Sequence, residues 1–170
     1  MGTRQTQQTE LKKSIREVWA VNEAMNQLLL QHIDDRAWRA EPPPGGRTLA
    51  AIFSHIHNDR LMWMTVWAKG RRRPPPTSRH KLTRKQAARA LARSAAALAE
   101  VFAARLRGSS SPEAVACLSL MLVHDAHHRG QVMMLTRQLG YRLPKEAAYG
   151  IWQWGKLWKK LGIRRRWPLP

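Results

Sequence analysis

Residues 111–140 read SPEAVACLSLMLVHDAHHRGQVMMLTRQLG. Ser111 followed by Pro112 is typical of a helix start, because serine caps a free backbone amide and proline is tolerated at the first helical position. Gly140 is typical of a helix end. The apolar residues between these points recur at helical spacing, so the segment predicts one long helix that carries a cluster of histidines.

Three more helices are predicted before this segment from the helical spacing of their apolar residues, over residues 10–33, 49–69 and 83–107. The breaks between them contain runs of proline, at residues 41–46 and 70–76, which cannot continue a helix. Thr48 is a candidate N-cap for the second helix. Thr83 and Gln86 have the spacing of a capping box for the third.

A further helical segment is predicted after Pro144. Four of its apolar residues fall on one helical face: Ile151, Trp154, Trp158 and Leu161. No strand-like alternation is present. The chain of 170 residues is therefore predicted to be all-α, a four-helix bundle with a short additional C-terminal helix or packed tail, in one domain over residues 1–170.

Composition excludes several classes of protein. Cys117 is the single cysteine, which excludes an intramolecular disulfide and a cysteine-based zinc finger. The longest nearly apolar run, residues 114–123, is shorter than the ~20 residues of a membrane-spanning helix. The N-terminal residues lack the apolar region of a secretory signal peptide. These absences predict a cytoplasmic protein without a membrane span.

Three of the seven histidines lie in HDAHHRGQ, residues 124–131. His124 and His128 are four residues apart, which places their Cβ atoms about 5–6 Å apart on one helix face. That separation allows two imidazoles to bind one metal ion at ~2.0–2.1 Å. His127 points away from this face. An isolated pair is as often one core and one surface histidine, so a metal site needs a further ligand.

A second pair of histidines occurs in AIFSHIHND, residues 51–59, within the predicted second helix. His55 is expected to face the bundle interior, where side chains of facing helices build metal sites. His57 points about 200° away from His55. It is therefore an alternative ligand to His55 and not an additional one.

These two segments carry a resemblance to a known family. TLAAIFSHIHNDRLMWM at residues 48–64 and HDAHHRGQVMMLTRQLGY at residues 124–141 resemble the DinB/YfiT-like metalloenzymes. These are damage-inducible helical bundles, not the DNA polymerase that shares the DinB name. The resemblance spans residues 11–162, and its most specific part is the motif H-x-x-x-H-R-G-Q. It implies that a divalent metal ion is bound by three histidines: His55, His124 and His128.

Three neutral imidazoles leave at least one coordination position open, which is typical of catalytic sites. Nickel, zinc, iron and manganese all remain candidates, because an all-histidine site does not discriminate among them. Members of this family with known activities resemble thiol-dependent enzymes, namely bacillithiol S-transferases and a mycothiol-dependent maleylpyruvate isomerase. The resemblance thus implies a transferase or hydrolase-like enzyme with a small-molecule substrate, a low-molecular-weight thiol as a further cofactor, and a homodimer. It names neither the substrate nor the catalytic base.

Two carboxylates are candidates for orienting the histidines. Asp59 lies one turn after His55 and could accept its imidazole N–H, although pairing with Arg60 or another base is at least an equal alternative. Asp125 lies about 100° round the helix from His124. A solvated or salt-bridged surface position is therefore expected for Asp125 ahead of an orienting role.

The charge of the chain supports a competing hypothesis. Thirty Lys+Arg against eleven Asp+Glu give a net charge of +19, which attracts polyanions. Basic clusters occur at residues 71–73, 79–85 and 156–166, the last interleaved with four tryptophans: Trp152, Trp154, Trp158 and Trp167. Cations among aromatic rings are typical of proteins that bind single-stranded nucleic acid.

No helix-turn-helix, zinc-finger or RNA-binding signature accompanies this charge. The leading hypothesis is therefore the metal-dependent enzyme. A non-catalytic basic bundle that binds nucleic acid or another polyanion is the alternative. A third hypothesis is a bundle that retains only a stabilising metal ion.

Overall fold

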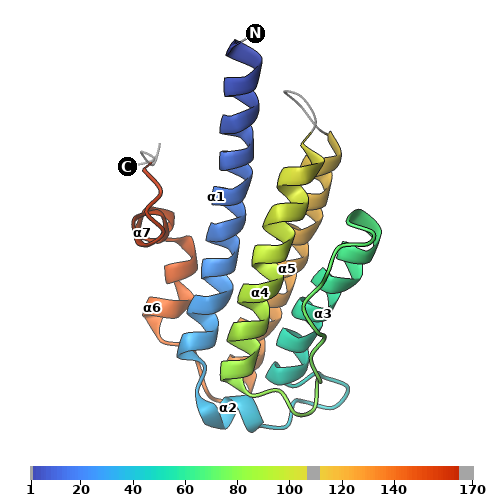
Figure 1. The fold of residues 1–170 in the computed structure, drawn as a ribbon. Helices are drawn as coiled ribbons and strands as arrows, with labels where there is room; N and C mark the ends of the chain where they lie inside the picture. Colours follow the sequence, from blue (N-terminus) through green and yellow to red (C-terminus); the bar gives the residue numbers. More distant parts are fainter. Residues whose placement is uncertain (1, 107–111, 165–170) are drawn as a thin grey trace.

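The computed structural model describes residues 2–106 and 112–164, and over these residues it consists of helices and loops without a strand (Figure 1). The elements are α1 (Gly2–His32), α2 (Asp35–Arg39), α3 (Leu49–Trp67), α4 (Arg84–Arg105), α5 (Pro112–Gln138), α6 (Lys145–Ala148), η1 (Gly150–Trp152) and α7 (Trp154–Lys160). The predicted all-α class is confirmed. None of the described helices has the length and apolar character needed to cross a membrane.

The four long helices pack side by side. α1 and α3 each contact both α4 and α5, and α4 also contacts α5. The short C-terminal elements α6, η1 and α7 pack against α1 instead (Figure 1). Helices α3 and α5 are therefore in direct contact within this group of four.

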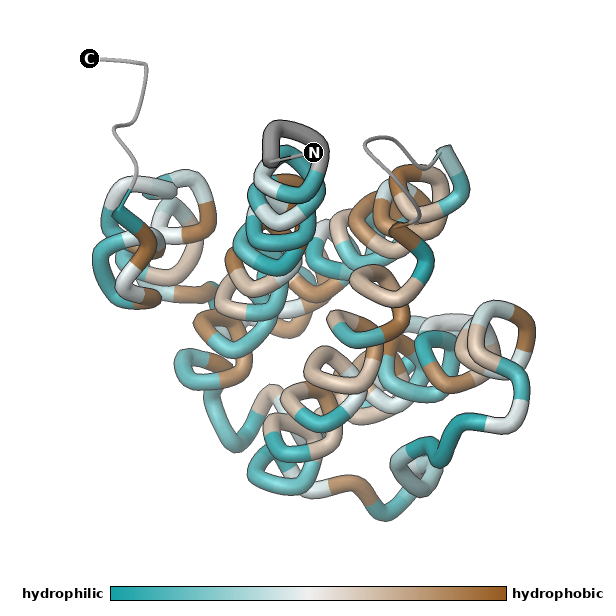
Figure 2. The backbone as a smooth tube through the Cα atoms, turned by 45° about the horizontal axis from the view of Figure 1, so that its top comes forward, coloured by the Kyte–Doolittle hydropathy of each residue, from teal (hydrophilic) through white to brown (hydrophobic). Residues whose placement is uncertain are grey.

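The core is divided into two apolar clusters by a polar layer. One cluster contains Phe53, Leu91 and Val132 among others, and the second contains Trp19 and Met121. Figure 2 shows hydrophilic and hydrophobic residues alternating along the long helices. Between the two clusters lie buried polar side chains from all four long helices: Asn22, Asn26, Arg60, Ser94, Asp125 and Arg129.

Local signals fix most of the helix ends. Thr83 and Gln86 form the predicted capping box, and the Thr48 hydroxyl accepts a hydrogen bond from the Ala51 amide. Gly140 has a φ of +79°, and the next amide, that of Tyr141, reaches the carbonyl of Thr136 in the turn that ends α5. The predicted cap at Ser111 lies outside the described residues.

One short helix, α2, was not predicted. Helix α2 is a single turn capped by Asp34, whose side chain accepts the amide of Arg36. One turn is too short to show periodicity. The C-terminal segment, expected as a short helix or a packed tail, forms the short elements α6, η1 and α7, which pack against α1. A Cβ at Gly150 would lie 2.8 Å from a Leu28 methyl carbon on α1, so a larger residue there would require the Leu28 side chain to shift.

Candidate metal centre

The histidines predicted from their spacing lie together on two facing helices. His55 is on α3, and His124 and His128 are one turn apart on α5. His124 Nε2 lies 3.1 Å from His128 Nε2 and 3.4 Å from His55 Nε2, and the three ligand nitrogens are all within 4.8 Å of one another. Two nitrogens bound to one tetrahedral ion at ~2.0–2.1 Å would lie about 3.3 Å apart. The arrangement therefore fits a divalent metal ion.

The three rings open onto a cavity of about 690 Å³ between α3, α5 and the loop that precedes α3. His128 is buried, whereas His55 and His124 are partly exposed. Arg47 lies at the wall of this cavity, and none of the described residues that line it is acidic. A small molecule can therefore reach the histidines, and the cavity favours one that carries negative charge.

The protonation state of the rings suits a metal. Burial lowers the pKa of His55, and it lowers the pKa of His128 to about 4. The neighbouring imidazoles act in the same direction because a second positive charge close by is unfavourable. Both rings are therefore neutral at pH 7, which is the state in which imidazole binds a metal ion.

Gln131 orients His128, a role that the sequence reasoning missed. Its Oε1 lies 2.8 Å from His128 Nδ1, and its Nε2 lies 3.0 Å from His127 Nε2. An amide oxygen only accepts hydrogen bonds, so this contact requires His128 to carry its proton on Nδ1 and leaves Nε2 free to face the cluster. The position of Gln131 three residues after His128 on α5 was the available signal.

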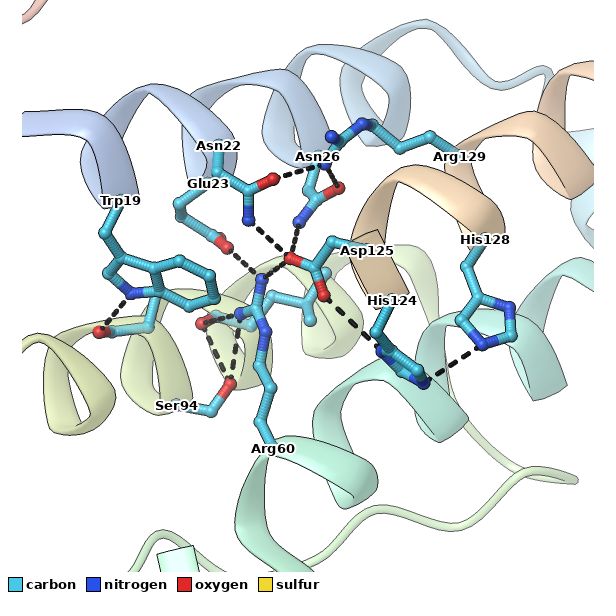
Figure 3. Close-up of polar contacts among 12 residues, drawn as sticks. Trp19, Asn22, Glu23, Asn26, Arg60, Ser94, His124, Asp125, His128 and Arg129 are labelled. Carbon is cyan, nitrogen blue, oxygen red and sulfur yellow. Dashed lines mark hydrogen bonds and ion pairs between the residues drawn. The ribbon is translucent and has the colours of Figure 1, made fainter. Parts of the chain in front are cut away.

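The expected surface position of Asp125 is wrong, because its side chain is fully buried. Its Oδ2 accepts hydrogen bonds from Asn22, Asn26 and Arg60, and its Oδ1 faces His124 Nδ1 at 3.7 Å (Figure 3). Burial alone would raise the pKa of Asp125, but the Arg60 guanidinium holds it well below its usual range. An ionised carboxylate therefore lies behind His124.

Arg60 is the second functional residue that the sequence reasoning missed. Its fully buried guanidinium lies between two carboxylates, 2.5 Å from Asp125 and 2.9 Å from Glu23. Arg129, also buried, donates to the amide oxygens of Asn22 and Asn26. A cation in the middle of the apolar helix α3 was the signal that could have identified it.

Asp59 lies beside a different histidine from the one expected. Its Oδ2 is 3.3 Å from His124 Nε2, on the side of the ring that faces the cluster, and the expected contact with His55 is replaced by this one. The pairing of Asp59 with Arg60 is also absent from the described contacts, because Arg60 points into the polar layer.

His57, the alternative ligand, is held away from the cluster. It is buried, and its Nε2 lies 3.0 Å from the carbonyl oxygen of Pro75 in the loop between α3 and α4. Ser54 and Asn58 bind Thr77 of the same loop. This face of α3 therefore anchors the loop, while His55 on the other side faces α5.

The aromatic residues of the basic C-terminal segment are only partly available to a ligand. Trp154 and Trp158 pack against the first apolar cluster, whereas Trp152 is 74% exposed. Trp167 and residues 165–166 lie outside the described residues. Within the described segment, one of these tryptophans is thus exposed and two pack against the core.

Comparison with known proteins gives one match. The model of the DinB family matches residues 5–153 of this chain. No curated protein and no solved structure matches at a significant level.

Proposed function

Since this chain belongs to the DinB family, we propose that it binds one divalent metal ion through His55, His124 and His128. We further propose that it is a metal-dependent enzyme acting on a small molecule in the adjoining cavity. The observation that supports this proposal most is the convergence of three imidazole Nε2 atoms from two helices. The proposal takes the chain as one domain built on a four-helix bundle.

The outer partners of the rings support the same assignment. Gln131 accepts from His128 Nδ1, and Asp125 lies behind His124 Nδ1. In metal-binding histidines, the N–H of the second ring nitrogen usually donates a hydrogen bond to such a group, and this bond fixes the tautomer and the ring direction. Both contacts leave an Nε2 lone pair directed at the proposed ion.

A bound divalent ion would supply Lewis acidity that lowers the pKa of a water molecule or thiol at its open position. The chain contributes the remaining functions. Arg47 attracts the anionic part of a substrate into the cavity, and Met134 and Leu135 cover part of its wall. Asp59 lies beside His124 Nε2 and is not among the described residues that line the cavity. Nickel, zinc, iron and manganese are the ions to test, and anionic low-molecular-weight thiols are the co-substrates to test first.

Purified protein is expected to bind one divalent ion per chain and to lose thermal stability when a chelator removes it. A ligand present at 100 times its Kd stabilises the folded state by about 2.7 kcal/mol. Elemental analysis, together with melting curves with and without chelator and after adding back the ion, tests this expectation. A chain that binds none of the four ions would contradict the proposal.

The metal-free protein is expected to lose stability as the pH falls from about 6.5 to about 4. The pKa of His128 is lowered to about 4 in the folded chain, so in this interval the unfolded chain binds the additional proton. The contribution is roughly 2–3 kcal/mol, present above pH 6.5 and lost on acidification. Urea unfolding at several pH values measures it, and a His128→Gln variant should show a smaller dependence.

A further inference from the structure

Asp125 belongs to the polar layer between the two apolar clusters and also faces His124 of the metal centre. Figure 3 shows Arg60 of α3 and Asn22, Glu23 and Asn26 of α1 gathered around Asp125 of α5. Two buried cations, Arg60 and Arg129, balance the two carboxylates in this layer. The layer is therefore a fixed, charge-balanced structure and not an extension of the cavity.

The two carboxylate oxygens of Asp125 have different surroundings. Oδ2 takes three donors, from Asn22 at 2.6 Å, Asn26 at 2.9 Å and Arg60 at 2.5 Å. Oδ1 is buried without a hydrogen bond among the described residues, and so is His124 Nδ1, which it faces at 3.7 Å. Because Oδ2 is held from three directions, the carboxylate has one remaining orientation, with Oδ1 directed at His124.

We propose that Arg60 is a positioning residue for the metal centre, acting through Asp125 on His124. This inference rests on the proposed three-histidine site. The Arg60 guanidinium fixes the carboxylate of Asp125 through its hydrogen bond to Oδ2. Asp125 in turn holds the proton of His124 on Nδ1 and directs Nε2 towards His55 and His128.

The geometry around Arg60 explains why arginine is needed. One terminal nitrogen donates to Glu23 and Asp125, while the other donates to the carbonyl of Leu91 and to the Ser94 hydroxyl. The Trp19 ring packs over the guanidinium at 4.9 Å. A lysine ammonium is a point charge without this planar fork, so it would not hold both carboxylates and α4 in the same arrangement.

The test measures Zn²⁺ affinity by competition with a chromophoric chelator for four variants: Arg60→Met, Asp125→Asn, the double variant, and Arg16→Met as a control that removes an exposed arginine paired with Glu100 outside the layer. We expect Arg60→Met and Asp125→Asn each to weaken Zn²⁺ binding by about 10–100-fold, the usual cost of losing an outer partner. The double variant should bind no more weakly than Asp125→Asn, because both changes interrupt one path. Arg16→Met should keep the wild-type affinity, and the Co²⁺ absorption spectrum should change only in the first three.

Wild-type Zn²⁺ affinity in Arg60→Met, or additive losses in the double variant, would overturn the inference. If Arg60→Met does not fold, Asp125→Asn is compared with the double variant, in which one cation and one carboxylate are both removed. A double variant that binds Zn²⁺ more weakly than Asp125→Asn overturns the inference. Failure of the wild-type protein to bind any metal would instead count against the proposed function. In that case ¹⁵N imidazole spectra of the metal-free chain test the inference about Arg60. His124 should carry its proton on Nδ1 in the wild type and should lose that preference in the double variant. Unchanged spectra would overturn the inference.

Discussion

Changing His124 or His128 to alanine is expected to abolish stoichiometric metal binding while leaving the helical content largely intact. Each change removes one of three converging nitrogens, and two remaining imidazoles cannot hold a divalent ion as tightly. The loss should exceed the 10–100-fold that an outer partner contributes. Elemental analysis and circular dichroism of the same preparations measure the two quantities.

His127→Ala is the matched control for this experiment. His127 lies on the same helix, its ring centroid is 4.9 Å from that of His128, and it lines the same cavity without joining the cluster of three nitrogens. The control should keep its metal. His57→Ala should also keep it and should lose stability instead, because the buried ring anchors the loop at Pro75. Unchanged metal content in both His124→Ala and His128→Ala would refute the site.

The histidine cluster could be predicted because its geometry is mostly local. The separation of His124 and His128 follows from the pitch of a single helix, and His55 and His57 differ in direction by the same rule. Local spacing does not predict that α3 lies against α5. The family resemblance implied this contact, and the structure brings His55, and not His57, to the pair on α5.

The surroundings of the cluster could not be predicted in the same way. Whether Asp125 is buried depends on where α1 lies relative to α5, and no spacing within α5 contains that information. The same holds for Asp59, whose carboxylate contacts His124 of the facing helix. Side chains between packed helices are placed by the tertiary structure, so a helical wheel predicts their direction but not their partners.

The net charge of +19 was a poor guide to the site for a related reason. Two of the cations counted in it, Arg60 and Arg129, are buried in the layer where Glu23 and Asp125 compensate them. They are unavailable to a polyanion. The net charge does not distinguish such buried cations from those at the surface. Arg47, at the cavity wall, is a cation that can attract an anionic substrate.

Arg60→Met is expected to lower the free energy of unfolding at pH 7 by about 3–5 kcal/mol, because it leaves the carboxylates of Asp125 and Glu23 without their cation in the protein interior. Arg16→Met, which breaks an exposed ion pair with Glu100, should cost no more than about 1 kcal/mol.

The low pKa of Asp125 stabilises the wild type at pH values above the ordinary pKa of an aspartate carboxyl, and this contribution is lost on acidification. The variant lacks it, so the two stabilities should converge as the pH falls. Urea unfolding of metal-free proteins measures both effects, and equal losses in the two variants at pH 7 would show that Arg60 does not hold the layer together.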